Sequence, residues 1–188
     1  MINDQYYDRR PSNWMNGRTV LSLILLMLAV LLPASVSSVE AAGTDDFIIT
    51  VKTDNPGDTS DTEFQIPVTG LGYNYDIDCD DDGTPEASGL TGAGVYSCSY
   101  ASAGTYTIRI SDASGSGTGF PRFTFAPGTP TSRDRQKLLT VEQWGTGQWD
   151  SMARAFNGAI NFTLNATDAP DLSNVTSMEA MFLGATAF

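Results

Sequence analysis

The 188-residue sequence contains no histidine. Histidine is the side chain whose ordinary pKa lies closest to neutral pH, and its imidazole is the commonest metal ligand. Its absence excludes Ser-His-Asp triads, histidine metal sites and imidazole general bases. We therefore expect a protein that is not an enzyme, and we assign no catalytic residues.

Basic residues are also scarce. The chain has 10 lysines and arginines against 22 aspartates and glutamates, which gives a net charge of −12. Such acidity keeps a protein soluble and repels the phosphates of nucleic acid and the head groups of anionic lipid. We expect no nucleic-acid partner.

Long hydrophobic runs are missing outside one segment near the N-terminus. Residues 20–32 are almost all apolar, three arginines precede them, and Val39-Glu40-Ala41 offers the small residues of a cleavage site. The run has 13 residues, whereas a membrane-spanning helix needs about 20. We predict that residues 1–41 are a signal peptide and that the protein is extracellular or at the cell surface. An uncleaved anchor is the alternative, and it is the only membrane contact we expect.

Only two cysteines occur, Cys79 and Cys98. An even pair in an exported chain usually forms a disulfide, because the compartment is oxidising. Both cysteines continue an alternating apolar pattern, so both should point to the buried side of a strand. We predict a bridge between strands or sheets that closes a loop of about 20 residues and contributes about 3 kcal/mol. Two buried free thiols are the alternative.

Short alternating segments separated by turn residues follow the predicted signal peptide. We expect strands at residues 44–53, 63–68, 73–79, 96–100 and 106–110, and a closing strand at residues 120–125. This spacing is typical of an antiparallel β-sandwich. The sandwich domain is predicted to span residues 42–130.

The remaining residues contain an internal repeat. Residues 149–159 and 175–185 share Ser, Met, Phe, Gly and Ala at an offset of 26, and Phe162 and Phe188 continue the match. The apolar spacing i, i+3, i+7 predicts a short helix in each copy, and residues 162–166 alternate like a short strand. A strand and a short helix in each 20–29 residues are typical of leucine-rich repeats. We predict that residues 131–188 begin such an array and that the array is truncated, because about three units are needed to bury a core. A chance helix–loop–helix is the alternative.

Two segments resemble known families. Residues 100–108, Tyr-Ala-Ser-Ala-Gly-Thr-Tyr-Thr-Ile, resemble the closing strand pair of polycystic-kidney-disease (PKD) domains. Residues 139–152, which end in Ser-Met, and residues 169–182, which contain Ser-Met and Met-Phe, resemble BspA-type leucine-rich-repeat surface proteins, also known as a domain of unknown function in mycoplasma lipoproteins.

The resemblance implies a mainly β chain. A PKD or immunoglobulin-like β-sandwich would be followed by the start of a leucine-rich-repeat-type α/β solenoid. It also implies a non-catalytic, exported cell-surface or secreted protein for binding or adhesion, whose ligand is an unidentified surface protein or glycan. The alternative is a carbohydrate-binding accessory region of a larger exported enzyme.

One acidic run suggests a metal site. Asp78-x-Asp80-x-Asp82-Gly83 matches the first half of a calcium loop, in which alternate carboxylates converge on the ion. Glu86 stands at position 9 of such a loop, but Gly89 replaces the glutamate expected at position 12. Calcium is therefore a candidate bound ion, with Asp78, Asp80 and Asp82 as its ligands. No other cofactor is required. A solvated acidic hairpin tip is the alternative.

Two tryptophans, Trp144 and Trp149, lie near the start of the repeat. They could form an aromatic platform for sugars. Because a terminal repeat must hide an apolar face, we favour the interpretation that they pack the junction between the sandwich and the first repeat.

Overall fold

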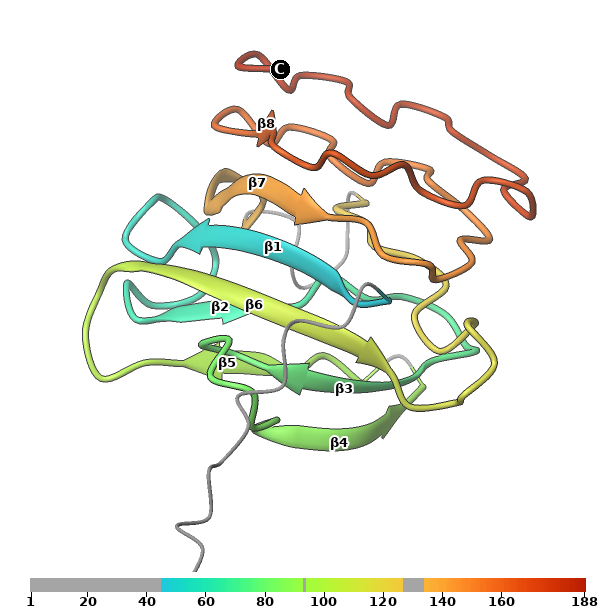
Figure 1. The fold of residues 1–188 in the computed structure, drawn as a ribbon. Coiled ribbons are helices and arrows are strands. Elements are labelled where there is room, and N and C mark those ends of the chain that lie inside the picture. The colour runs from blue at the N-terminus through green and yellow to red at the C-terminus, as the bar shows by residue number, and fades with distance from the viewer. Residues whose placement is uncertain (1–44, 93, 127–133) are drawn as a thin grey trace, which may run out of the picture. The chain divides into compact units, whose positions relative to one another are not determined.

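The computed structural model describes residues 45–92, 94–126 and 134–188, and the predicted signal peptide lies outside them. The described residues are mainly β (Figure 1). The strands are β1 (Phe47–Lys52), β2 (Glu63–Gln65), β3 (Asn74–Asp78), β4 (Ala87–Thr91), β5 (Ser97–Ser99), β6 (Thr105–Asp112), β7 (Leu138–Gln143) and β8 (Thr163–Leu164). A 3₁₀ helix, η1 (Asp134–Gln136), precedes β7.

The strands form a mixed six-stranded sheet and a two-stranded sheet. The order in the larger sheet is β4-β3-β6-β1-β7-β8, and the smaller sheet pairs β2 with β5. All neighbours pair antiparallel except β7 and β8, which run parallel. Two layers are therefore present, as expected of a sandwich, but they are unequal.

Alternation along the strands builds the core between these layers. Ile49 of β1 lies opposite Ile108 of β6, and Tyr75 and Ile77 of β3 are fully buried. Side chains two residues apart share a face of a strand, so the alternating sequence fills one face with apolar groups. The predicted strands around β1, β2, β3, β5 and β6 are confirmed.

Two segments differ from the prediction. Residues 120–125 do not form a strand, although their phenylalanines enter the core. β4 was not expected, because its sequence Ala-Ser-Gly-Leu-Thr carries no apolar alternation and its residues are half-buried or exposed. It forms through its pairing with β3 at the edge of the sheet.

A disulfide joins the two sheets. Cys79, directly after β3, is bonded to Cys98 of β5, and the two Cα atoms are 5.6 Å apart. Both side chains are buried. The predicted bridge is thus present, and it links one sheet to the other.

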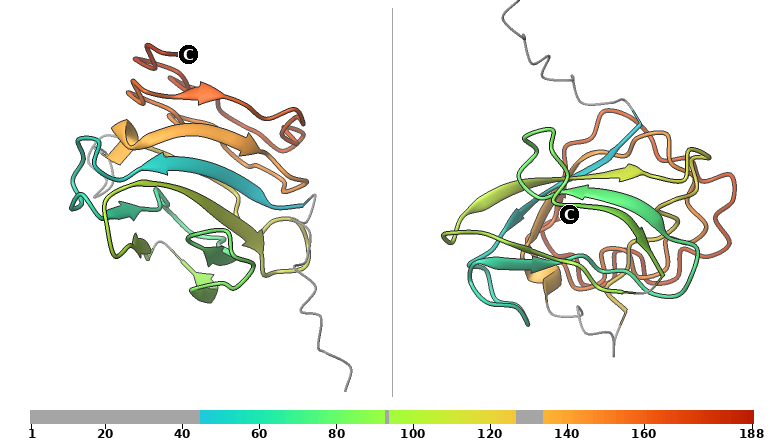
Figure 2. Two further views of the ribbon diagram at one scale, coloured as in Figure 1. Left: turned by 60° about the vertical axis from the view of Figure 1, so that its left-hand side comes forward. Right: turned by 90° about the horizontal axis from the view of Figure 1, so that it is seen from below.

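The larger sheet continues from the predicted sandwich into the predicted repeat region. β7 pairs antiparallel with β1, so that Ile49 lies opposite Val141, and β8 adds in parallel to β7. Figure 2 shows β7 and β8 extending the sheet beyond β1. The predicted boundary at residues 130/131 lies outside the described residues, but the sheet and the core on either side of it are continuous.

The short helices predicted for the repeat are wrong. Residues 149–159 and 175–185 form successions of turns, and the described part of the chain contains no α-helix. The reason is that Arg154 and Ala180 have φ values of 59° and 53°, and Gly158 and Gly184 follow with 72° and 76°. Such left-handed residues interrupt a right-handed helix every fourth position. A solenoid of alternating strands and helices is therefore not what these residues form.

The 26-residue repeat itself is present. We name residues 149–162 copy 1 and residues 175–188 copy 2. Backbone N–H groups of copy 1 donate to carbonyls of copy 2 over 2.8–2.9 Å, in the pairs Met152 to Ser177, Arg154 to Glu179, Phe156 to Met181 and Gly158 to Leu183. Phe156 stacks on Phe182 and Phe162 on Phe188, with ring centroids 5.4 and 5.7 Å apart. Equivalent residues of the two copies therefore lie one above the other.

In the described part of the chain, no helix has the length and apolar character needed to cross a membrane.

Candidate functional site

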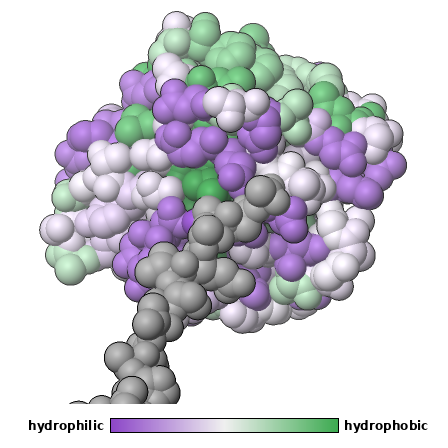
Figure 3. All heavy atoms as spheres, in the orientation of Figure 1, coloured by the Kyte–Doolittle hydropathy of each residue, from purple (hydrophilic) through white to green (hydrophobic). Residues whose placement is uncertain are grey.

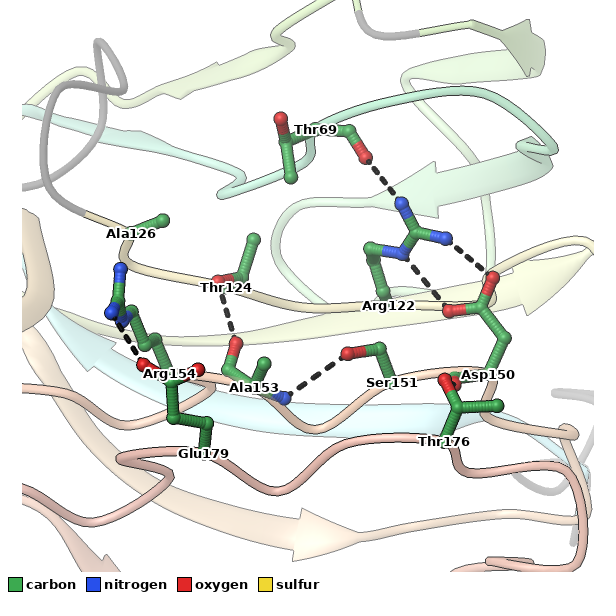
Figure 4. Close-up of a pocket in the computed structure, with 10 residues that line it drawn as sticks. All are labelled: Thr69, Arg122, Thr124, Ala126, Asp150, Ser151, Ala153, Arg154, Thr176 and Glu179. Carbon is green, nitrogen blue, oxygen red and sulfur yellow. Dashed lines mark hydrogen bonds and ion pairs between the residues drawn. The ribbon is translucent and has the colours of Figure 1, made fainter.

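A pocket of about 580 Å³ lies where the segment before residue 127 meets the two copies (Figure 4). Its lining residues come from four parts of the chain. They are Thr69, Arg122, Thr124, Ala126, Asp150, Ser151, Ala153, Arg154, Thr176 and Glu179.

Hydrogen bonds hold the walls of the pocket together. The Thr124 hydroxyl donates to the carbonyl of Ala153 over 2.9 Å, and the Asp150 N–H donates to the carbonyl of Pro121 over 2.9 Å. Copy 2 is attached in the same way, since the Thr176 N–H donates to the Asp150 carbonyl over 3.0 Å. These backbone and side-chain hydrogen bonds therefore hold the segment before residue 127 and the two copies together around the pocket.

The ionisable side chains that line the pocket form two ion pairs. Arg122 binds Asp150 with two parallel hydrogen bonds, from Nε to Oδ1 over 2.9 Å and from Nη2 to Oδ2 over 2.6 Å. Figure 4 shows this guanidinium between the Asp150 carboxylate and the Thr69 carbonyl. Hydrogen bonding to Asp150 raises the pKa of Arg122. At the rim, Arg154 Nη2 lies 2.7 Å from Glu179 Oε1.

This arrangement favours a neutral polar ligand. The pocket is charge-balanced, because each guanidinium faces a carboxylate. The pairs are surrounded by hydroxyl groups, which belong to Thr69, Thr124, Ser151 and Thr176. The Thr124 and Thr176 hydroxyls already donate to backbone carbonyls, so they offer a ligand their lone pairs as acceptors. A small number of placed polar groups in a concave site is the usual arrangement for orienting a bound molecule.

The two copies contribute equivalent positions to the pocket. Asp150 corresponds to Thr176 and Ala153 to Glu179, and all four line it. The positions that support the stack are instead the same in both copies, namely Met152/Met178, Phe156/Phe182, Gly158/Gly184 and Ala159/Ala185. Four pairs that support the stack are thus the same in the two copies, whereas two pairs that line the pocket differ; Ser151, which also lines it, is the same residue as Ser177.

The predicted metal ligands come together only in part. Oxygens of Asp78, Asp80 and Glu86 lie within 4.8 Å of one another, whereas Asp82 is not in this group. Glu86 takes the place that the sequence pattern assigned to Asp82. Exposed acidic groups of this kind also occur without a metal, so calcium binding stays a prediction.

Asp78 has a structural use in the same turn. Its side chain is only 3% exposed. Oδ1 accepts hydrogen bonds from the N–H groups of Asp80 and Asp82 over 3.3 Å, and Oδ2 accepts one from the Gly83 N–H over 2.8 Å. The carboxylate therefore closes the turn by satisfying three backbone donors.

A single arginine offsets part of the acidity of this turn. Arg109 of β6 donates from Nε to Asp81 over 2.7 Å and from Nη1 to Asp46 over 2.9 Å. Charge-assisted contacts of this kind fix side chains in place. The alternative to calcium was an acidic hairpin tip surrounded by water. Because Arg109 binds Asp81, that description holds for only part of the turn.

The two tryptophans lie in the core. Trp144 and Trp149 are 5% and 2% exposed, and each packs against Phe47, with ring centroids 5.8 and 5.0 Å apart. The interpretation that they pack the junction is confirmed. A sugar platform is wrong, because neither ring presents a face to solvent.

The sequence did not reveal the ion pair at the centre of the pocket. Arg122 and Asp150 are 28 residues apart and belong to different predicted domains. Nothing in the local sequence around a single arginine in a loop, or a single aspartate in a repeat, predicts that the two will form an ion pair. Only the internal comparison of the copies, in which Asp150 corresponds to Thr176, marks one of them as a varied position.

Comparison with known proteins gives no match: no family model, no curated protein and no solved structure matches this chain.

Proposed function

We propose that this chain is a non-catalytic, exported protein of the cell surface or the extracellular medium, and that it binds a neutral glycan in the pocket around Arg122 and Asp150. The observation that carries the proposal is the charge-balanced, hydroxyl-lined pocket at the junction of the sandwich and the repeat. Neutral glycans offer many hydroxyl groups and no charge, so paired donors and acceptors suit them. A strongly anionic ligand is disfavoured by the net charge of −12.

Three further features support the proposal. Residues 1–41 have the pattern of a signal peptide, and a disulfide suits an oxidising compartment. The absence of histidine argues against catalysis. The resemblance to BspA-type surface proteins suggests a binding or adhesion role for the same region.

The first test is a binding screen. Labelled protein is applied to immobilised neutral polysaccharides, including β-glucan, mannan and galactan, alongside the variant Thr176→Trp. Thr176 is an exposed pocket residue, so an indole there fills the pocket without disturbing the core. We expect retention of the unmodified protein on at least one polysaccharide and loss of that retention in the variant.

The matched control is Ser88→Trp, which adds the same side chain at an exposed position of β4. It should bind like the unmodified protein. Retention that survives Thr176→Trp would refute the pocket as the binding site, and no retention on any neutral polysaccharide would refute the ligand class.

A further inference from the structure

A second pocket, of about 270 Å³, adjoins the first, because Asp150 lines both of them. Gly72, Thr118, Gln148 and Asn174 also line it. These residues come from the same four parts of the chain as the lining of the first pocket, since Gln148 directly precedes copy 1 and Asn174 directly precedes copy 2. The two pockets therefore belong to one region of the surface.

Three segments that line both pockets run side by side. The first precedes residue 127, and the other two contain copy 1 and copy 2. Hydrogen bonds of 2.7–3.1 Å join the first segment to the second in the pairs Gly117 and Gln148, Pro121 and Asp150, and Phe125 and Arg154. Hydrogen bonds of 2.9–3.0 Å join the second to the third in the pairs Asp150 and Thr176, Met152 and Ser177, and Arg154 and Glu179. Residue numbers rise in the same order in every segment, so the segments are parallel and the second pocket precedes the first along them.

We call the two pockets together the groove. At the end formed by the second pocket, Thr118 and Asn174 are exposed, and at the other end Glu179 is exposed. Thr176, which lies between the ends, is exposed as well. A chain molecule can therefore lie along the groove with both of its own ends in solvent.

The second pocket offers groups that complement hydroxyls. The Asn174 amide nitrogen donates to Gln148 Oε1 over 3.0 Å, which fixes both side chains. The Gln148 amide nitrogen and the Asn174 amide oxygen have no partner among the described residues, so the pair presents a donor and an acceptor. Among the described residues that line this pocket, only Asp150 is ionisable, and Arg122 already neutralises it. The second pocket thus suits the same neutral, hydroxyl-rich chemistry as the first.

The exposed apolar side chains of copy 2 lie outside the groove. Met178, Phe182, Leu183 and Phe188 are exposed, and they line neither pocket. Figure 3 shows hydrophobic surface gathered at the end of the molecule where the C-terminal residues lie in Figure 1. The groove therefore suits a polar chain rather than an apolar one.

We propose that the groove binds an extended neutral oligosaccharide, with neighbouring sugar units in the two pockets and Asp150 at their boundary. This inference rests on the proposed function, which supplies the glycan in the first pocket. It adds that the ligand is a linear chain bound along its length. Units of one chain gain the second set of contacts without a second loss of translational freedom. A longer oligosaccharide therefore binds more tightly than a short one.

The test compares disaccharides and hexasaccharides of the laminari, manno and galacto series by isothermal titration calorimetry. In at least one series, the hexasaccharide should bind the unmodified protein at least about tenfold more tightly than the disaccharide, which one or two additional hydrogen bonds would provide. Asn174→Trp places an indole in the second pocket at an exposed position. It should reduce hexasaccharide affinity to the level of the disaccharide and leave disaccharide affinity unchanged. Ser88→Trp is the matched control and should bind both like the unmodified protein.

Three results would overturn the extended site alone. The unmodified protein could bind both lengths with equal affinity. Asn174→Trp could bind the hexasaccharide like the unmodified protein, or it could weaken both lengths equally. The proposed glycan site itself would fail in a different way, through no binding of any oligosaccharide or through binding that survives Thr176→Trp.

Discussion

The ammonium group of Lys137 donates a 2.7 Å hydrogen bond to the carbonyl oxygen of Ser60, which lies 77 residues earlier in the chain. The same Nζ donates to the carbonyls of Thr59 and Glu63 over 3.1 and 2.9 Å. Lys137 is fully buried, and this burial lowers its pKa. A buried charge persists only where polar partners surround it, and the loop before β2 together with the first residue of β2 provides them.

Asp134 makes the complementary contacts with this loop. Its carboxylate accepts hydrogen bonds from the N–H groups of Asp58, Thr59 and Gln65 over 2.8–3.1 Å. It is fully buried as well. The start of the repeat region is thus fastened into the predicted sandwich by two buried charged residues, in addition to the pairing of β7 with β1.

The first prediction concerns Gly57, which lies against this pair. A Cβ at this position would overlap the Asp134 carboxylate and the Lys137 Cε atom. We expect Gly57→Ala to lower the free energy of unfolding by about 1–3 kcal/mol, the usual effect of overpacking, as measured by urea denaturation. Gly94→Ala is the control, because a Cβ there meets nothing within 4 Å. It should change the free energy of unfolding by less than about 0.5 kcal/mol. Equal effects of the two substitutions would contradict the packing described around Lys137.

The second prediction concerns the bridge between the sheets. Unfolded, unreduced protein should show no free thiol, because Cys79 and Cys98 are bonded to each other. Replacing both by alanine should lower the free energy of unfolding by about 3 kcal/mol, since the unfolded chain loses a constraint on a loop of about 20 residues. Two reactive thiols in the unreduced protein would refute the bridge.

The third prediction concerns alkaline stability. Burial raises the pKa of both Tyr73 and Tyr75 to about 12, whereas the unfolded chain releases these protons near pH 10. The folded state therefore holds protons that the unfolded state has lost, so the stability contribution is complete below pH 10 and disappears as the pH rises to 12. Burial lowers the pKa of Lys137, so this residue has the opposite effect: the stability of the fold rises with pH until the unfolded chain also loses this proton, near the ordinary pKa of 10.5. Above that pH Lys137 adds no further change. Urea midpoints should fall steeply between pH 10 and 12.

Phenylalanine variants separate the two tyrosines. The Tyr73 hydroxyl donates to the Arg122 carbonyl over 2.9 Å, whereas the Tyr75 hydroxyl is buried with no partner among the described residues. Tyr75→Phe should reduce the fall of the urea midpoint between pH 10 and 12. It should not lower the free energy of unfolding at pH 7, because an unsatisfied buried hydroxyl is unfavourable. Tyr73→Phe should also reduce the fall of the urea midpoint between pH 10 and 12. In addition it should lower the free energy of unfolding at pH 7 by about 1 kcal/mol, because it removes a hydrogen bond. Midpoints that stay constant to pH 12 in the unmodified protein would refute the assignment.

The fourth prediction separates two sets of calcium ligands. The calcium hypothesis predicts that millimolar calcium raises the melting temperature, and the structure groups Asp80 with Asp78 and Glu86 but not with Asp82. Asp80→Asn should therefore abolish the rise, while Asp82→Asn should keep it. No rise in the unmodified protein would end the hypothesis, and a rise lost only with Asp82→Asn would favour the sequence-derived set.

Local patterns were sufficient for part of the fold. The alternation from Tyr73 to Cys79 predicted both the strand β3 and the buried side of Cys79, because a period of two is a property of the strand itself. β4 escaped notice because it forms through pairing with β3 rather than through its own sequence.

The repeat shows where such patterns reach their limit. The offset of 26 is visible in the sequence, but the spacing i, i+3, i+7 suits a helix and a series of turns equally well. Positive φ angles at Arg154 and Ala180 decide between them, and neither residue type signals that conformation. The pocket depends on Arg122 meeting Asp150 across the junction, which only the assembled fold brings about.

The pocket around Arg122 and Asp150 is the proposed binding site for a neutral glycan. Its most direct test is a titration of isotope-labelled protein with an oligosaccharide of the polysaccharide retained in the screen, followed by amide chemical shifts. We expect saturable shifts concentrated at Thr124, Ser151 and Thr176, which line the pocket. Shifts confined to another face of the molecule, or none at millimolar ligand, would contradict it.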